Sequence, residues 1–152
     1  MHKSISLAAY VKKRNGLPLG ADGSLKAMLI RSLGAESFYV FWQYWNPIWG
    51  FYLSRNIMRP LNKIFPVGIS ILLTFAVSGA LHDLAVTLFK WRITFFFTPW
   101  FTLMGAMVLL SKSFDITYKT NKWLYRMFCN LLFILISFAI TFYIVTFRYN
   151  LN

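Results

Sequence analysis

Acidic residues are scarce in this sequence: four Asp and Glu stand against sixteen Lys and Arg, which leaves a formal net charge of +12. The single cysteine, Cys129, excludes an intramolecular disulfide. The two histidines, His2 and His82, are too far apart along the chain for the ligand spacing of a metal site. We therefore expect no disulfide-stabilised domain, no metal site and no organic cofactor.

Apolar side chains are abundant instead. Hydrophobic residues make up 58% of the chain and aromatic residues 20%, with a mean hydropathy of +0.55. An ordinary soluble domain is about 45–50% apolar. The composition therefore predicts an all-α integral membrane protein. The basic residues are scattered around the apolar segments, which favours contact with cytoplasmic lipid headgroups over nucleic-acid binding.

Three apolar runs are candidates for transmembrane helices: 65–89, 93–110 and 127–147. The first has the length to cross a hydrocarbon core of about 30 Å, since a helix rises about 1.5 Å per residue. Thr94, Thr98 and Thr102 recur at helical spacing in the second run, which is typical of close helix packing. We expect three transmembrane helices.

An aromatic segment, FYVFWQYWNPIWGFYL from Phe38 to Leu53, precedes these runs and contains no charge. Trp and Tyr prefer the headgroup level of a membrane, and Pro47 and Gly50 interrupt a straight helix. We expect a re-entrant or interfacial helical element. One kinked transmembrane helix is the alternative.

The N-terminal residues 1–37 are polar and basic, and we expect them to form a cytoplasmic or interfacial segment before a membrane domain at 38–152. Within them, Ser24 can cap a helix that ends near Gly34 and is amphipathic. Such a helix can lie on the membrane surface or pack on the protein, and the sequence favours neither. Its apolar face would hold Leu25, Met28, Leu29 and Leu33.

The distribution of basic residues predicts the orientation. Nine Lys and Arg precede the first apolar run and four lie between the second and third, whereas three lie in the remaining connections. Because basic residues collect in cytoplasmic loops, we expect a multi-pass protein with its N-terminal region in the cytoplasm.

His82 and Asp83 form an ionisable pair inside the first apolar run. Placing such a pair in a membrane costs a few kcal/mol, so a functional site is the default hypothesis. Thr74, Ser78 and His82 follow one another at every fourth position and share a helix face. Gly79 and Ala80 leave room for another helix or a substrate to approach. The alternative role for the pair is hydrogen bonding to a neighbouring helix.

Two motifs resemble the membrane-bound O-acyltransferase family: FWQYWNP, from Phe41 to Pro47, and SGALHDL, from Ser78 to Leu84. The resemblance covers about residues 38–90. It implies that His82 is the catalytic histidine and that Asn46 is a second functional position. Asp83 matches an acidic residue that often follows this histidine. Members of that family are longer and have more transmembrane helices than this chain.

The resemblance implies transfer of an acyl group from a thioester, usually acyl-CoA, to a hydroxyl group. His82 would be the general base, and Asn46 would orient the acceptor or stabilise the oxyanion. Ser78 and Asp83 would support the histidine. The implied partners are membrane lipids, the thioester donor and a glycan or lipid acceptor.

Two other functions remain open. The chain could be a non-catalytic or split subunit of an acyltransferase that assembles with copies of itself or with a second membrane chain. It could also relay protons through His82 and Asp83. Two basic segments have two interpretations each, solvated charge or attraction of phosphate groups: Lys12-Lys13-Arg14, and the stretch with Lys112, Lys119 and Lys122.

Overall fold

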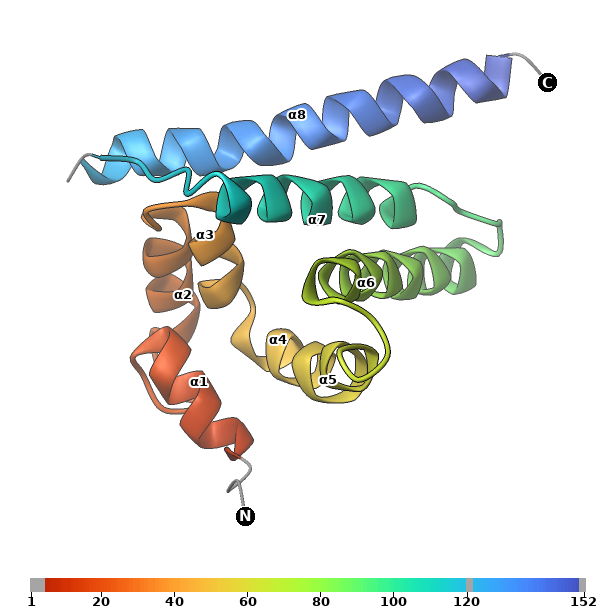
Figure 1. Ribbon diagram of the computed structural model, residues 1–152. Helices are drawn as coiled ribbons and strands as arrows, with labels where there is room; N and C mark the ends of the chain where they lie inside the picture. The colour runs from red at the N-terminus through yellow and green to blue at the C-terminus, as the bar shows by residue number, and fades with distance from the viewer. Residues whose placement is uncertain (1–4, 120–121, 151–152) are drawn as a thin grey trace.

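A computed structural model of the chain describes residues 5–119 and 122–150. These residues form helices and contain no strand, which confirms the all-α prediction. A single π-helical turn, η1, joins two of the helices. The elements in chain order are α1 (Leu7–Asn15), α2 (Ser24–Leu33), α3 (Phe38–Tyr44), α4 (Pro47–Leu53), η1 (Ser54–Met58), α5 (Arg59–Leu61), α6 (Val67–Lys90), α7 (Phe97–Ser113) and α8 (Trp123–Asn150) (Figure 1).

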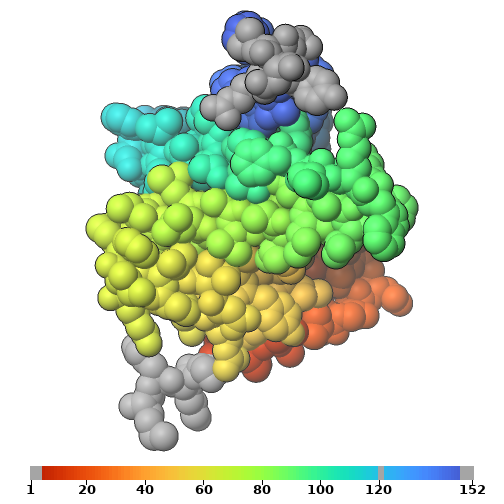
Figure 2. All heavy atoms as spheres, turned by 90° about the vertical axis from the view of Figure 1, so that its right-hand side faces the viewer, coloured from red at the N-terminus to blue at the C-terminus, as the bar shows by residue number. Residues whose placement is uncertain are grey.

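The longest helices lie in layers. α7 returns antiparallel along α6, and α8 lies on the other side of α7 (Figure 1). α4 and α5 lie beyond α6, so that the end view shows α8, α7, α6 and α4–α5 in sequence (Figure 2). α1, α2 and α3 gather at one end of this stack (Figure 1). Residues that are remote in sequence therefore meet where α3 and α4 face α6 and α7.

In the part of the chain that the structure describes, two helices are long and apolar enough to cross a membrane: α6, with 24 residues, and the 25-residue part of α8 from Trp123 to Phe147. Only 33% of the apolar window of α6 and 17% of that of α8 are buried, unlike the core helix of a soluble protein. α7 has 17 residues, or about 25 Å, which is less than the hydrocarbon thickness. The structure thus has two helices of membrane-spanning length where we expected three.

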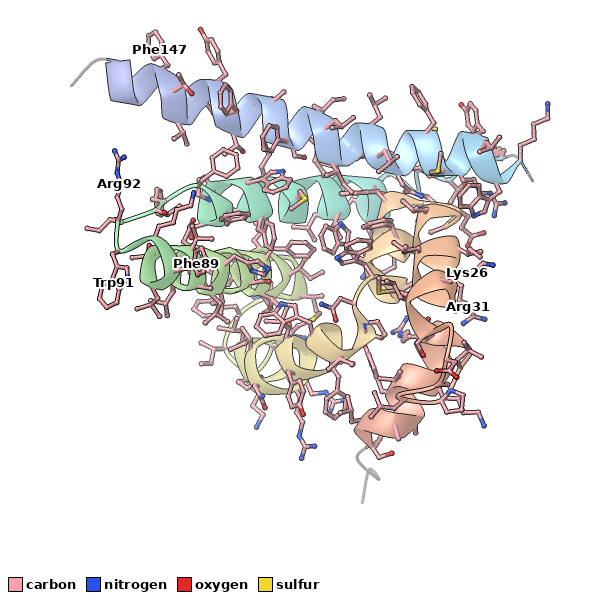
Figure 3. All side chains as sticks on the ribbon, turned by 180° about the vertical axis from the view of Figure 1, so that it is seen from behind. Lys26, Arg31, Phe89, Trp91, Arg92 and Phe147 are labelled. Carbon is pink, nitrogen blue, oxygen red and sulfur yellow. The ribbon has the colours of Figure 1, made fainter. Side chains whose placement is uncertain are left out.

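The two ends of the stack differ in their side chains. Lys26 and Arg31 project from α2 at one end, whereas Phe89, Trp91 and Arg92 lie at the opposite end, where α6 connects to α7 (Figure 3). Phe147, near the end of α8, lies on this second side as well (Figure 3). Trp91 is 93% exposed and Phe89 is 85% exposed. The end that joins α6 to α7 therefore presents large apolar surfaces outward.

The aromatic segment forms two short helices, α3 and α4, of seven residues each. Trp45 and Asn46 separate them, and Asn46 has a φ of 40°, in the left-handed region that Asn tolerates better than most residues. Pro47 then takes the first position of α4, where its missing N–H costs no hydrogen bond. The segment is therefore not one kinked helix, because the chain changes direction at Asn46.

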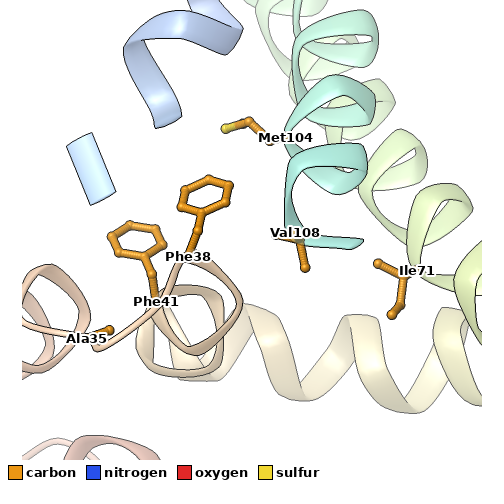
Figure 4. Packing of buried hydrophobic residues seen from close by; sticks show 6 residues of the cluster. All are labelled: Ala35, Phe38, Phe41, Ile71, Met104 and Val108. Carbon is orange, nitrogen blue, oxygen red and sulfur yellow. The ribbon is translucent and has the colours of Figure 1, made fainter. Parts of the chain in front are cut away.

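The buried hydrophobic cluster ties this segment to the long helices. Phe38 and Phe41 of α3 are 0% and 1% exposed. The ring of Phe38 stacks on Phe133 of α8 at a centroid distance of 4.9 Å. These contacts fix α3 against α7 and α8. The cluster comprises Ala35, Phe38, Phe41, Ile71, Met104 and Val108 (Figure 4).

A buried amide connects α8 to α2. Asn130 is 0% exposed, and its Nδ2 donates to the carbonyls of Leu33 and Ala35, both at 3.0 Å. Its Oδ1 accepts from the hydroxyl of Tyr118 at 3.1 Å, and burial raises the pKa of this phenol, which keeps it protonated. α2 ends at Leu33, next to Gly34 as predicted, but its N-cap is Gly23 and not Ser24, whose hydroxyl donates to the Ala21 carbonyl at 2.7 Å. The helix packs against α3 and α8.

The backbones of α6 and α7 approach closely at Gly79. A Cβ on Gly79 would lie 2.5 Å from the carbonyl oxygen of Phe97 and 2.7 Å from the Cα of Thr98. The space that the sequence predicted beside Gly79 is therefore filled by α7. We expect Gly79→Ala to lower the free energy of unfolding by about 1–3 kcal/mol, because the added methyl group must push backbone apart.

Thermal unfolding in detergent, followed by circular dichroism, would measure this effect. Gly68→Ala on the same helix is a matched control, because its Cβ would meet Leu109 at an ordinary 3.9 Å. Alanine favours helix more than glycine does, so this control should be neutral or slightly stabilised. Equal midpoints for the two variants would contradict the close approach at Gly79.

Candidate active site

A cavity of about 410 Å³ lies between α3, α4, α6 and α7, with α1 at one end. Asn46, Ser78 and His82 all line it, so the fold brings together three of the four predicted site residues. Thr74 lines it as well, as expected for a polar stripe along one face of α6. No carboxylate lies among the described residues that form its wall.

The hydrogen bond of His82 determines which ring nitrogen is available. Its Nδ1 lies 2.7 Å from the carbonyl oxygen of Ser78, one turn earlier on α6. A carbonyl can only accept, so Nδ1 carries the proton in this contact, and the neutral ring keeps its lone pair on Nε2. The imidazole is half-buried beside Phe97 and Phe101, at ring-centroid distances of 5.8 and 4.9 Å. The arrangement has what a general base needs: a fixed ring and a free nitrogen.

Trp49 connects the two predicted functional positions. Its indole N–H donates to the Oγ of Ser78 at 3.0 Å, and its ring packs edge-on against His82 at 6.1 Å. Its backbone N–H donates to the Oδ1 of Asn46 at 3.2 Å. Trp49 is not one of the predicted site residues. Its position three residues after Asn46 is the spacing of a helix-capping bond, but its contact with Ser78 depends on tertiary structure.

Asn46 is the N-cap of α4, and this role occupies its side-chain oxygen. Its backbone N–H points to the sulfur of Met28 at 3.3 Å. The Nδ2 group has no hydrogen bond among the described residues, and the side chain is exposed at the cavity wall. Asn46 can therefore both position Trp49 and offer an N–H to a bound molecule.

Asp83 has a structural role. Its Oδ1 accepts from the backbone N–H groups of Phe96 and Phe97 at 2.9 and 2.8 Å. Its Oδ2 accepts from the backbone N–H and the hydroxyl of Thr98 at 2.8 and 2.7 Å. A helix leaves its first N–H groups unpaired, and this buried carboxylate satisfies them for α7.

The four donors around Asp83 explain why α7 begins at Phe97 rather than at Ile93, where the apolar run begins. Asp83 does not line the cavity, and both of its oxygens are occupied. Of the four predicted site residues, Asp83 is therefore the one that the fold separates from the histidine's cavity. Ser78 supports the histidine through its backbone carbonyl, and its hydroxyl accepts from Trp49.

Comparison of the chain with protein-family models, with curated proteins and with solved structures finds no match. Among residues 5–119 and 122–150, no group of three or more His, Cys, Asp or Glu side chains is close enough to hold a metal ion.

Proposed function

We propose that this chain is a multi-pass integral membrane enzyme that transfers an acyl group from a thioester, such as acyl-CoA, to a hydroxyl group. The observation that carries the proposal is the hydrogen bond from Nδ1 of His82 to the Ser78 carbonyl. This bond leaves Nε2 as a base in a cavity that Asn46 also lines. The resemblance of the two motifs to membrane-bound O-acyltransferases gives the same two residues these roles.

The chemistry follows from the side chains. Nε2 of His82 removes the proton from the acceptor hydroxyl, and the oxygen attacks the thioester carbonyl. Nδ2 of Asn46 donates to the oxyanion that forms. When the tetrahedral intermediate collapses, the carbon–sulfur bond breaks, and the imidazolium returns its proton to the thiolate. The products are an ester and a free thiol, and His82 is again neutral.

The position of His82 along α6 bears on the acceptor. It is eight residues before Lys90 and fifteen after Val67, or about 12 Å and 22 Å along the helix. In the orientation predicted from three apolar runs, thirteen of the sixteen basic residues share the side of the N-terminal region. With that side cytoplasmic, the acceptor has the shorter route from outside, which suits an exported glycan or lipid.

The proposal is tested by turnover. The purified chain in lipid nanodiscs is supplied with short and long acyl-CoA donors and with a panel of glycan and lipid alcohols, and release of free thiol is followed. We expect thiol release that depends on the alcohol. If no combination of donor and alcohol gives thiol release, the chain is not active alone. That result supports the alternative, a subunit that needs a second membrane chain.

Asn46 offers a selective variant. Asn46→Asp keeps the oxygen that caps α4 but removes the Nδ2 donor. We expect its thermal unfolding midpoint to be unchanged or slightly higher, because a carboxylate suits a helix N-terminus. We expect kcat to fall about 10²-fold, as when an oxyanion donor is removed. Wild-type kcat in a folded Asn46→Asp protein would limit Asn46 to the capping role.

A further inference from the structure

Two basic residues that are remote in sequence line the same cavity as His82: Arg14 of α1 and Lys112 of α7. Both belong to basic segments for which the sequence left two roles open. Arg14 is half-buried and Lys112 is exposed, but both line the cavity, whereas Lys12 and Lys13 do not.

Both cations are held by one face of α3. The guanidinium of Arg14 donates from Nη1 to Oε1 of Gln43. The ammonium of Lys112 lies 5.1 Å from the centre of the Tyr39 ring. Tyr39 and Gln43 are four residues apart, so they occupy adjacent turns on the same side of the helix. α3 thereby brings one cation from α1 and one from α7 to the same end of the cavity.

The positive charge at this end has no acidic partner in the described part of the chain. No carboxylate lines the cavity, and the oxygen that faces Arg14 belongs to the neutral amide of Gln43. The Nε of Arg14 is buried and has no hydrogen-bond partner. The C-terminal end of α1 favours a cation nearby, but it leaves this N–H unsatisfied. Arg14 is half-buried in the cavity wall, and a guanidinium there without an acidic partner suits a bound anion.

The distance from these cations to His82 limits the ligand. Phe101, also on α7, packs against the His82 ring. Lys112 is eleven residues further along the same helix, or about 16 Å. An anionic group bound beside Lys112 would therefore lie roughly 16 Å along α7 from the level of the His82 ring.

We propose that Arg14, Lys112 and Gln43 form an anion subsite that binds a phosphate group of the substrate, with the reactive part of the same molecule extending to His82. Arginine suits this task because its planar guanidinium matches phosphate geometry. The phosphate belongs either to a soluble thioester such as acyl-CoA or to a lipid. This assignment to a substrate depends on the proposed function, whereas binding at the subsite does not.

Binding is measured by calorimetry with the full chain in phosphatidylcholine nanodiscs. The probe for the soluble source is coenzyme A, with pantetheine as its counterpart without phosphate. The probe for the lipid source is short-chain phosphatidic acid, with the matching diacylglycerol. We expect one phosphate-bearing probe to bind at least tenfold more tightly than its neutral counterpart. Arg14→Gln should remove that advantage.

Two further variants separate charge from folding. Gln43→Glu is isosteric and places a carboxylate against Arg14, so it should also abolish the preference for phosphate. Lys26→Gln removes an exposed cation of α2 that does not line the cavity, and it should leave binding unchanged. Without ligand, Arg14→Gln should unfold close to the wild-type temperature, because the favourable effect of the α1 C-terminus on this cation is small and the cation has no acidic partner.

The proposal is overturned if neither phosphate-bearing probe exceeds its neutral counterpart, or if Lys26→Gln weakens binding as much as Arg14→Gln. His82→Gln lacks the proposed base but should bind the phosphate probe as the wild type does. Binding at the subsite is thereby tested separately from catalysis. Binding without turnover would therefore retain the subsite and reject only the transfer reaction.

Discussion

Replacing His82 with glutamine is expected to lower kcat for acyl transfer by about 10²–10⁴-fold, the range that general-base catalysis contributes. Glutamine can still donate a hydrogen bond to the Ser78 carbonyl, which accepts from Nδ1 in the wild type. It has no basic lone pair to take the place of Nε2. The variant therefore removes the base and keeps the local hydrogen bond. The measurement is thiol release from acyl-CoA in nanodiscs.

His82→Phe is the companion variant. The imidazole packs among Trp49, Phe97 and Phe101, and phenylalanine would retain that aromatic packing. Both variants should fold, as judged by their thermal midpoints, and both should be inactive. If His82→Gln turns over at the wild-type rate, the imidazole is a packing residue and the proposed mechanism is wrong.

Replacing Asp83 with alanine is expected to destabilise the protein by about 3 kcal/mol or more. The substitution leaves three backbone N–H groups at the start of α7 and one threonine hydroxyl without their acceptor. Each buried unsatisfied group costs about 1–3 kcal/mol, although water can reach some of them after the change. A loss of 3 kcal/mol lowers the thermal midpoint of a chain of this size by roughly 6–12 °C.

Asp83→Asn refines this test. The amide can keep one oxygen for Phe96 and Phe97, but its NH₂ group faces the backbone N–H of Thr98. The loss should therefore lie between those of the alanine variant and the wild type. Asp22→Ala, at an exposed position, is the control and should not shift the midpoint. Similar midpoints for Asp83→Ala and Asp22→Ala would be inconsistent with a capping role.

Local sequence signals predicted the helices well where they acted alone. α6 was expected at 65–89 and is Val67–Lys90, because Pro66 precedes a long apolar run. The signals failed where a remote residue sets the boundary. α7 begins four residues later than its apolar run because the Asp83 carboxylate caps it. α8 begins four residues earlier than expected, at Trp123, whose indole donates to the Ile30 carbonyl.

The sequence predicted which residues form the candidate site but not the role of each one. His82 and Asn46 were identified by motif and Ser78 by its helical spacing from His82, and the fold brings all three to one cavity. Asp83 was grouped with His82 because the two are adjacent in sequence. Consecutive residues on a helix point about 100° apart, so His82 and Asp83 face different neighbours. His82 faces the cavity, and Asp83 faces the start of α7. The Pro99 near the start of α7 is the local signal that a helix N-terminus lies there.

The contacts of Asn130 have a consequence for the order of assembly during synthesis. The carbonyl of Leu33, to which it donates, belongs to a segment that the ribosome makes 97 residues earlier. That carbonyl and its neighbour at Ala35 must be hydrated until the last helix emerges, because a buried carbonyl needs a donor. The C-terminal end of α2, although translated early, therefore keeps its water until α8 is made.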